Sequence, residues 1–236
     1  MFDVVTSLGY NCEISFRLEN FYGKIEAMPF SWSYVLERDN LPLVIENMDI
    51  LFAGDLTLQE DHMIKCENTQ IKFHPRYEIL LPNGVCTEES VAAAKDELCA
   101  RVKHLKEKFV QVLDSEKFIL FIMKVENKGE ENNLSYIRAV KTALEKKCRS
   151  GRFKLLVVME KAAITERIKG VETVNLKVCG VRKFAPRKHT DTLGDVRAWK
   201  RILQEATGDS GRGYYVRLNC KRIEWLKAVL IKRLHR

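Results

Sequence analysis

Residues 2–32 read FDVVTSLGYNCEISFRLENFYGKIEAMPFSW, and they predict a β-strand, a turn and an α-helix in succession. The apolar run Phe2–Val5 is typical of a buried strand. A tight turn is predicted at Gly9–Asn11, and after it apolar residues recur at spacings of four and three, as on one face of a helix. Those residues are Ile14, Leu18 and Phe21. The stretch therefore predicts a strand–turn–helix unit with Cys12 at the start of the helix.

Cys12 is the candidate nucleophile. The first turn of a helix has unpaired N–H groups and the positive end of the helix dipole, and both favour a thiolate. A thiolate is the form of cysteine that attacks carbonyl carbons. Asn11 beside it either caps the helix or donates its amide to an oxyanion. The alternative is a small buried cysteine that packs at a tight turn.

Two short motifs in this stretch carry a family resemblance. Ser7–Gly9, Asn11 and Cys12, followed by Met28–Trp32, resemble the signature of a bacterial and viral family named as papain-like cysteine peptidases, an SLG-x-NC element followed by a PF-D-W element. The resemblance implies that Cys12 is the nucleophile. Ser31 stands where the family has Asp, so a role of that carboxylate does not carry over.

A thiol nucleophile needs a base within reach and, usually, a group that orients the base. His74 and His189 are the two candidates, and the sequence leaves the choice between them open. Asp191 or Asp195 is expected to orient His189. The expected substrate contacts come from the turn, from an aromatic side chain and from a basic loop. They are Ser7, Gly9, Tyr10, Asn11, Trp32, Arg187 and Lys188.

The rest of the chain alternates between helix and strand patterns. Residues 87–113, 134–148 and 162–168 have helical periodicity, whereas 118–123, 153–159 and 174–178 read as strands. This series predicts an α/β fold, a three-layer α/β/α Rossmann-like sandwich with a mostly parallel sheet. It differs from the papain fold, in which no such series is expected. Substrate is then expected over the carboxyl ends of the strands, where Gly9–Cys12, Lys124–Gly129 and Glu160–Lys161 converge.

The remaining segments are predicted as parts of a single domain over residues 1–236. Residues 34–48 read as a helix that Pro42 starts or kinks. Residues 50–84 read as an irregular insertion with brief strands, and residues 182–236 as a basic C-terminal helical region. From residue 182 onward there are fifteen Lys or Arg against five Asp or Glu, a net charge of +10. The net charge of the whole chain is +8, so residues 1–181 carry about −2. It suits a polyanion partner or forms a solvated face.

The composition predicts a cytoplasmic protein. No apolar run reaches the roughly 20 residues that a transmembrane helix requires. The seven cysteines have no C-x-x-C spacing, which disfavours structural zinc and agrees with reduced thiols.

Three functions are compatible with these patterns. The first is a Cys-dependent hydrolase or acyl transferase that needs no cofactor and acts on a small-molecule, glycan or peptide substrate. The alternative is a metal-independent glycosyltransferase that binds a nucleotide sugar at the SLGYN turn, because a helix N-terminus binds phosphate and no DxD metal motif is present. The third is a polyanion-binding module built on the basic C-terminal region.

Overall fold

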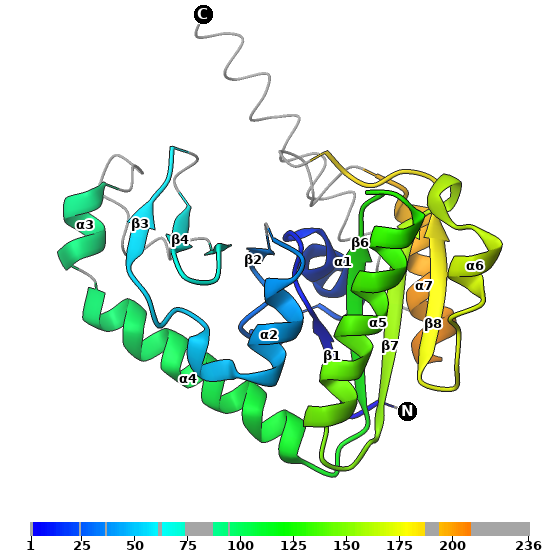
Figure 1. Ribbon diagram of the computed structural model, residues 1–236, viewed down its shortest axis with the longest axis horizontal. Coiled ribbons are helices and arrows are strands. Elements are labelled where there is room, and N and C mark those ends of the chain that lie inside the picture. Colours follow the sequence, from blue (N-terminus) through cyan, green and yellow to red (C-terminus); the bar gives the residue numbers. More distant parts are fainter. Residues whose placement is uncertain are drawn as a thin grey trace, which may run out of the picture.

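The computed structural model describes residues 2–23, 25–35, 37–60, 63–73, 87–93, 95–186 and 194–208. The chain is an α/β protein whose main sheet has four parallel strands in the order β1-β6-β7-β8 (Figure 1). The strands are β1 (Val4–Ser7), β6 (Ile119–Val125), β7 (Phe153–Glu160) and β8 (Leu176–Val181). The predicted α/β class and the parallel sheet are confirmed.

Strand β6 is the centre of the core. All seven of its residues are buried, as the continuous apolar run predicted. Its neighbours pair in parallel on both sides, with Val5 opposite Leu120 and Phe121 opposite Leu155. Strand β1 begins at Val4, two residues later than predicted, and its pairing with β6 extends to Ser7.

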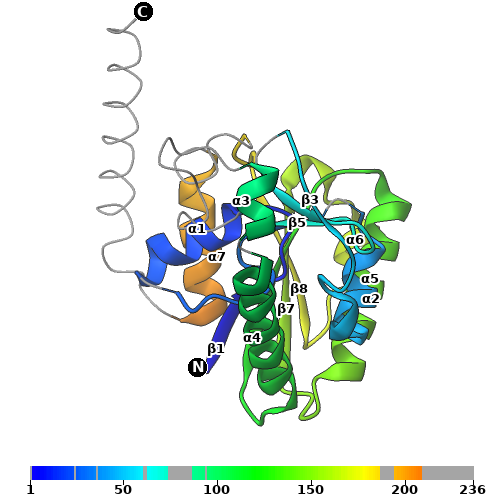
Figure 2. The same cartoon turned by 90° about the vertical axis from the view of Figure 1, so that its left-hand side faces the viewer.

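Helices pack against both faces of this sheet. On one face, α1 (Glu13–Tyr22) and α7 (Val196–Thr207) share a cluster with Leu120 and Ile122 of β6. On the other face, α4 (Lys95–Asp114) and α5 (Glu130–Lys147) pack against Phe121. Figure 2 shows α1 and α7 together on its left side and α5 on its right. The alternation of side chains along a strand explains why neighbouring residues of β6 reach opposite faces.

The chain leaves β1 and β6 in opposite directions. After β1 it enters α1 on one face, and after β6 it enters α5 on the other face. In open α/β sheets, ligands bind at the carboxyl ends of adjacent strands whose connections diverge in this way.

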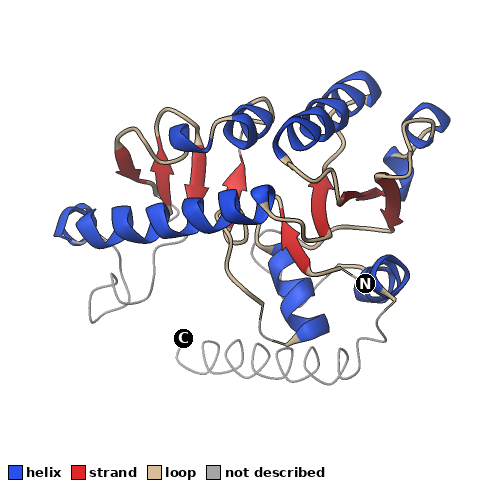
Figure 3. Cartoon of the chain, turned by 90° about the horizontal axis from the view of Figure 1, so that it is seen from below, coloured by secondary structure: helices blue, strands red, loops and turns tan. Residues whose placement is uncertain are grey.

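A second, antiparallel sheet lies beside the first. It contains β2 (Ser33–Val35), β5 (Ile71–Phe73), β4 (Ile64–Cys66) and β3 (Leu56–Leu58), in that spatial order. Part of the predicted irregular insertion is therefore regular sheet. Figure 3 shows α4 extending from the small sheet toward the main one. Its Leu98 packs with Ile64, whereas Phe109 packs in the main core.

The helix predicted over residues 34–48 is wrong at its start. Tyr34 lies in β2, and the helical part is α2 (Asn40–Glu46), followed by a 3-10 turn at Met48–Ile50. Pro42 lies in the first turn of α2, where proline costs no hydrogen bond.

The other predicted helices correspond to observed ones. Residues 87–113 contain α3 (Glu88–Ala93) and α4, and the predicted 162–168 helix is a 3-10 turn at Lys161–Ala163 followed by α6 (Glu166–Lys169). Residues 74–84 and 209–236, which include the predicted basic C-terminal helix, lie outside the described residues. Within the described part, no helix is long and apolar enough to cross a membrane.

Candidate active site

The turn between β1 and α1 is shaped by local hydrogen bonds. The Gly9 N–H donates to Ser7 Oγ at 3.0 Å, and the Glu13 N–H donates to Asn11 Oδ1 at 3.0 Å. Gly9 has a φ of +83°, and a Cβ atom there would lie 3.1 Å from Val35 Cγ2. Glycine therefore suits both the backbone conformation and the close approach of β2.

Glu13 is the centre of a buried polar network. Its side chain is fully buried, and its carboxylate accepts hydrogen bonds from Lys124 Nζ at 3.0 Å and Arg17 Nη2 at 3.3 Å. It also accepts from the Trp199 Nε1–H at 3.1 Å and the Ala185 N–H at 3.2 Å. A buried carboxylate is costly unless it is paired in this way. The network therefore joins the start of α1 to β6, to α7 and to the segment that follows β8.

Lys124 carries this network to the protein surface. Its side chain is 1% exposed, and its ammonium group lies 3.7 Å from Glu126 Oε1 and 4.2 Å from the Phe184 ring centre. The Tyr10 hydroxyl donates to the other oxygen of the Glu126 carboxylate. The Glu126 side chain is 40% exposed. Glu126 is thus the point at which the buried network reaches solvent, at the carboxyl end of β6.

Arg38 fixes the β6–α5 turn from the other side. Its Nη1 donates to Asn133 Oδ1 at 2.8 Å, its Nη2 donates to the backbone carbonyl of Glu126, and its guanidinium lies 5.2 Å from the Tyr136 ring centre. Arg38 is 8% exposed, and its Nε has no hydrogen-bond partner in the described part of the chain. Burial lowers the pKa of Arg38.

Cys12 occupies the predicted position but not the predicted state. It is the N-cap residue of α1 and is 4% exposed. Burial raises the pKa of its thiol to about 12, which opposes the expected thiolate. The cause is loss of solvation, because a buried thiolate is poorly solvated and the favourable helix terminus contributes only about 0.3–1 kcal/mol at an exposed site.

The predicted bases are not placed by the structure. His74, His189 and Asp191 lie outside the described residues, as do Arg187 and Lys188. Their assignments remain predictions. The histidine that the described residues do contain, His104, is exposed on α4.

Trp32 belongs to a turn that supports α1. Its ring packs edge-on against Phe16 of α1, with the centroids 5.0 Å apart. The Ser15 hydroxyl of α1 donates to the Ser31 carbonyl, and the Met28 N–H donates to Ser31 Oγ at 3.1 Å. Trp32 also lines a small, open apolar hollow between α4 and the small sheet. Cys12 is not among the lining residues of that hollow.

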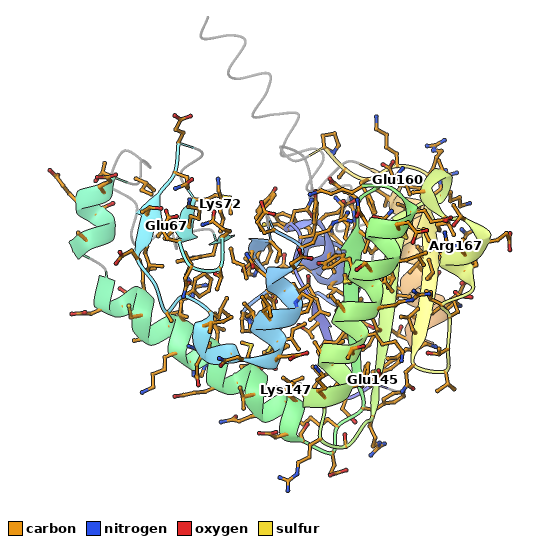
Figure 4. The ribbon with its side chains drawn as sticks, in the orientation of Figure 1. Glu67, Lys72, Glu145, Lys147, Glu160 and Arg167 are labelled. Atoms are coloured by element: carbon orange, nitrogen blue, oxygen red, sulfur yellow. The ribbon has the colours of Figure 1, made fainter. Side chains whose placement is uncertain are left out.

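Near the ends of β7 and β8, carboxylates accept hydrogen bonds from backbone N–H groups. Glu160, at the end of β7, accepts from the Phe184 N–H at 2.9 Å, and Asp195 accepts from the Arg182 N–H at 2.8 Å. Figure 4 shows Glu160 near the upper, carboxyl end of the main sheet and Glu145 near the lower end of α5. Among the described residues, no cluster of three or more His, Cys, Asp or Glu is arranged to hold a metal ion.

Two parts of this site were missed by sequence reasoning. Glu13 and Arg17, four residues apart, share the inner face of α1 with Ile14 and Leu18, and charges on an apolar face indicate a buried pair. Arg38 has no such signal, because its neighbours in the sequence are exposed. Lys124–Gly129 were expected at this edge, and the structure brings Lys124 and Glu126 beside Tyr10.

The chain was compared with known proteins. No family model, no curated protein and no solved structure matches it. Its function is therefore inferred from the chemistry of the site.

Proposed function

We propose that the chain is a group-transfer enzyme, a transferase or a hydrolase, that works at the carboxyl ends of β1 and β6 with Glu126 as its general base. One observation supports this above the others: the partly exposed Glu126 carboxylate is held by the Tyr10 hydroxyl and lies 3.7 Å from the buried Lys124 ammonium. A carboxylate positioned in this way takes a proton from water or from an acceptor hydroxyl.

The surroundings of Glu126 suit this chemistry. The Lys124 ammonium and the N-terminal end of α1 place positive charge beside the crevice, and preorganised positive charge stabilises the negative charge that develops in a transition state. Glu13 keeps Lys124 in place without being exposed itself. In this proposal Glu13 and Lys124 are positioning residues and Glu126 is the catalytic residue.

The proposal favours the metal-independent transferase over the thiol mechanism. A carboxylate base suits transfer from a nucleotide sugar to a hydroxyl, so nucleotide sugars are the first co-substrates to test. The resemblance to the papain-like cysteine peptidases then reflects shared turn architecture, in which Ser7, Gly9 and Asn11 shape the backbone and Cys12 packs behind it. The N-cap position of Cys12 is the feature that supports the second candidate, a thiol hydrolase.

The proposal also takes the architecture to be a Rossmann-like α/β/α sandwich. The packing of α1 and α7 on one face and of α4 and α5 on the other supports three layers. The diverging connections after β1 and β6 support a ligand crevice of the kind such sheets use.

A turnover screen tests the function. The wild-type protein and the variants Glu126→Gln, Glu145→Gln and Cys12→Ala are incubated with nucleotide sugars and with activated esters, and products are measured by mass spectrometry. Glu145 is a matched control, because its side chain is 44% exposed and also pairs with a lysine. We expect Glu126→Gln to lower turnover by about 100-fold or more and the other two variants to retain it. Loss of turnover in Cys12→Ala with full activity in Glu126→Gln would establish the thiol mechanism instead.

A further inference from the structure

Arg38 is a buried cation that no carboxylate in the described part of the chain neutralises by contact. Its two Nη groups donate to neutral oxygens, the Asn133 amide and the Glu126 backbone carbonyl. Within the described residues it forms no ion pair, and its Nε–H has no acceptor. A buried charge in this situation is expensive and favours an anionic partner.

The nearby carboxylates are engaged elsewhere. The Glu126 carboxylate accepts from Tyr10 and lies beside Lys124. Glu130 and Glu131, in the first turn of α5, both bind the Arg167 guanidinium. The Glu126 carboxylate attracts Arg38 electrostatically, but the guanidinium bonds the backbone carbonyl of Glu126 and not its carboxylate.

The place that Arg38 holds is suited to an anion. The β6–α5 turn leads into an 18-residue helix, whose first N–H groups and dipole favour negative charge. Arg38 is directed at this end of α5, because one Nη bonds the Glu126 carbonyl of the turn and the other bonds Asn133 near the start of the helix. Gly129, the N-cap residue, has no atom within 4 Å of the position of an added Cβ, so the turn has open space beside it.

We infer that the substrate carries an anionic group, a phosphate or a carboxylate, that binds at the β6–α5 turn against Arg38. This inference rests on the proposed function, in which Glu126 of the same turn is the base. It places the reacting hydroxyl or water at the Glu126 carboxylate and the anionic group at the guanidinium on the other side of the Glu126 backbone.

Binding of simple anions tests the inference without any turnover. Inorganic phosphate and, separately, acetate are titrated into the full chain at constant ionic strength, with calorimetry and thermal unfolding as readouts. The variants are Arg38→Gln, Asn133→Asp and the control Arg152→Gln. Arg152 is an exposed arginine that donates to the Glu116 carbonyl at the opposite end of the sheet. Asn133→Asp keeps the size of the side chain and supplies a carboxylate 2.8 Å from Arg38, in place of the ligand.

We expect phosphate or acetate to bind the wild type and Arg152→Gln, and the affinity to fall at least tenfold in Arg38→Gln and in Asn133→Asp. Which of the two anions binds distinguishes a phosphate-bearing from a carboxylate-bearing substrate. If Arg38→Gln does not fold, Asn133→Asp decides. Equal affinity in wild type and Asn133→Asp, or no binding of either anion, overturns the inference. Those results leave the Glu126 proposal standing, whereas normal turnover in Glu126→Gln overturns that proposal and leaves the anion titration unaffected.

Discussion

Replacing Lys124 with Met tests whether the buried network holds the site together. Lys124→Met keeps a long side chain in the β6 position but removes the charge that pairs with Glu13 at 3.0 Å. Glu13 would remain fully buried with Arg17 as its charged partner. Removal of one partner from a buried pair costs about 3–5 kcal/mol of unfolding free energy, because the other charge is left in a medium that solvates it poorly.

The assay is urea denaturation at neutral pH, followed by tryptophan fluorescence, to which the fully buried Trp199 contributes together with Trp32 and Trp225. Lys141→Met is the control, since Lys141 pairs with Glu145 on the surface of α5 and such pairs contribute about 0.3–0.5 kcal/mol. The double variant Glu13→Gln/Lys124→Met should be more stable than the sum of the two single losses implies. A loss below about 1 kcal/mol for Lys124→Met would refute the interpretation that this pair organises the start of α1.

Three further outcomes follow from the same structure. At pH 8 iodoacetamide should label Cys12 at least about 1,000-fold more slowly than the exposed Cys99. The reason is that a thiol with a pKa near 12 is only about 10⁻⁴ thiolate at this pH. Peptide mapping that shows Cys12 modified first would restore the nucleophile hypothesis. Burial raises the pKa of Cys12 and Cys148 to about 12, so their contribution to stability is complete below about pH 9 and is lost as pH rises toward 12. The free energy of unfolding measured by urea titration should therefore fall between pH 9 and 11, by up to about 1.4 kcal/mol per pH unit for each thiol. A flat profile would contradict the burial of both. Gly9→Ala should lower the melting temperature, because a non-glycine residue at positive φ costs about 1–2 kcal/mol. The control Gly151→Ala should lower it less, since Gly151 has a φ of +64° but open space around it.

Local patterns predicted the parallel core well. The continuous apolar runs of β6 and β7 formed strands where the pattern placed them, because each segment buries its own apolar residues. Strand β2 was missed, since its three residues have too little periodicity to compete with a helical pattern and are strands because β5 pairs with them. Such long-range pairing is not encoded locally.

The candidate site was predicted in location more than in chemistry. The β1–α1 turn and the end of β6 do meet, as the parallel topology required. Burial of Cys12 was one of the two alternatives that the sequence left open, and its position at the start of a helix could not decide between them. Arg38 reaches Asn133 across 95 residues of sequence, so no spacing could have indicated it.

Chemical rescue of Glu126→Ala is the most direct measurement of the central claim. Removing the carboxylate leaves space beside Tyr10 and Lys124, and a small added anion such as formate can act as the base in its place. The account predicts that turnover lost in Glu126→Ala returns in proportion to formate concentration, while Cys12→Ala remains active without it. Turnover that formate does not restore, together with an inactive Cys12→Ala, would contradict the assignment of Glu126 as the base.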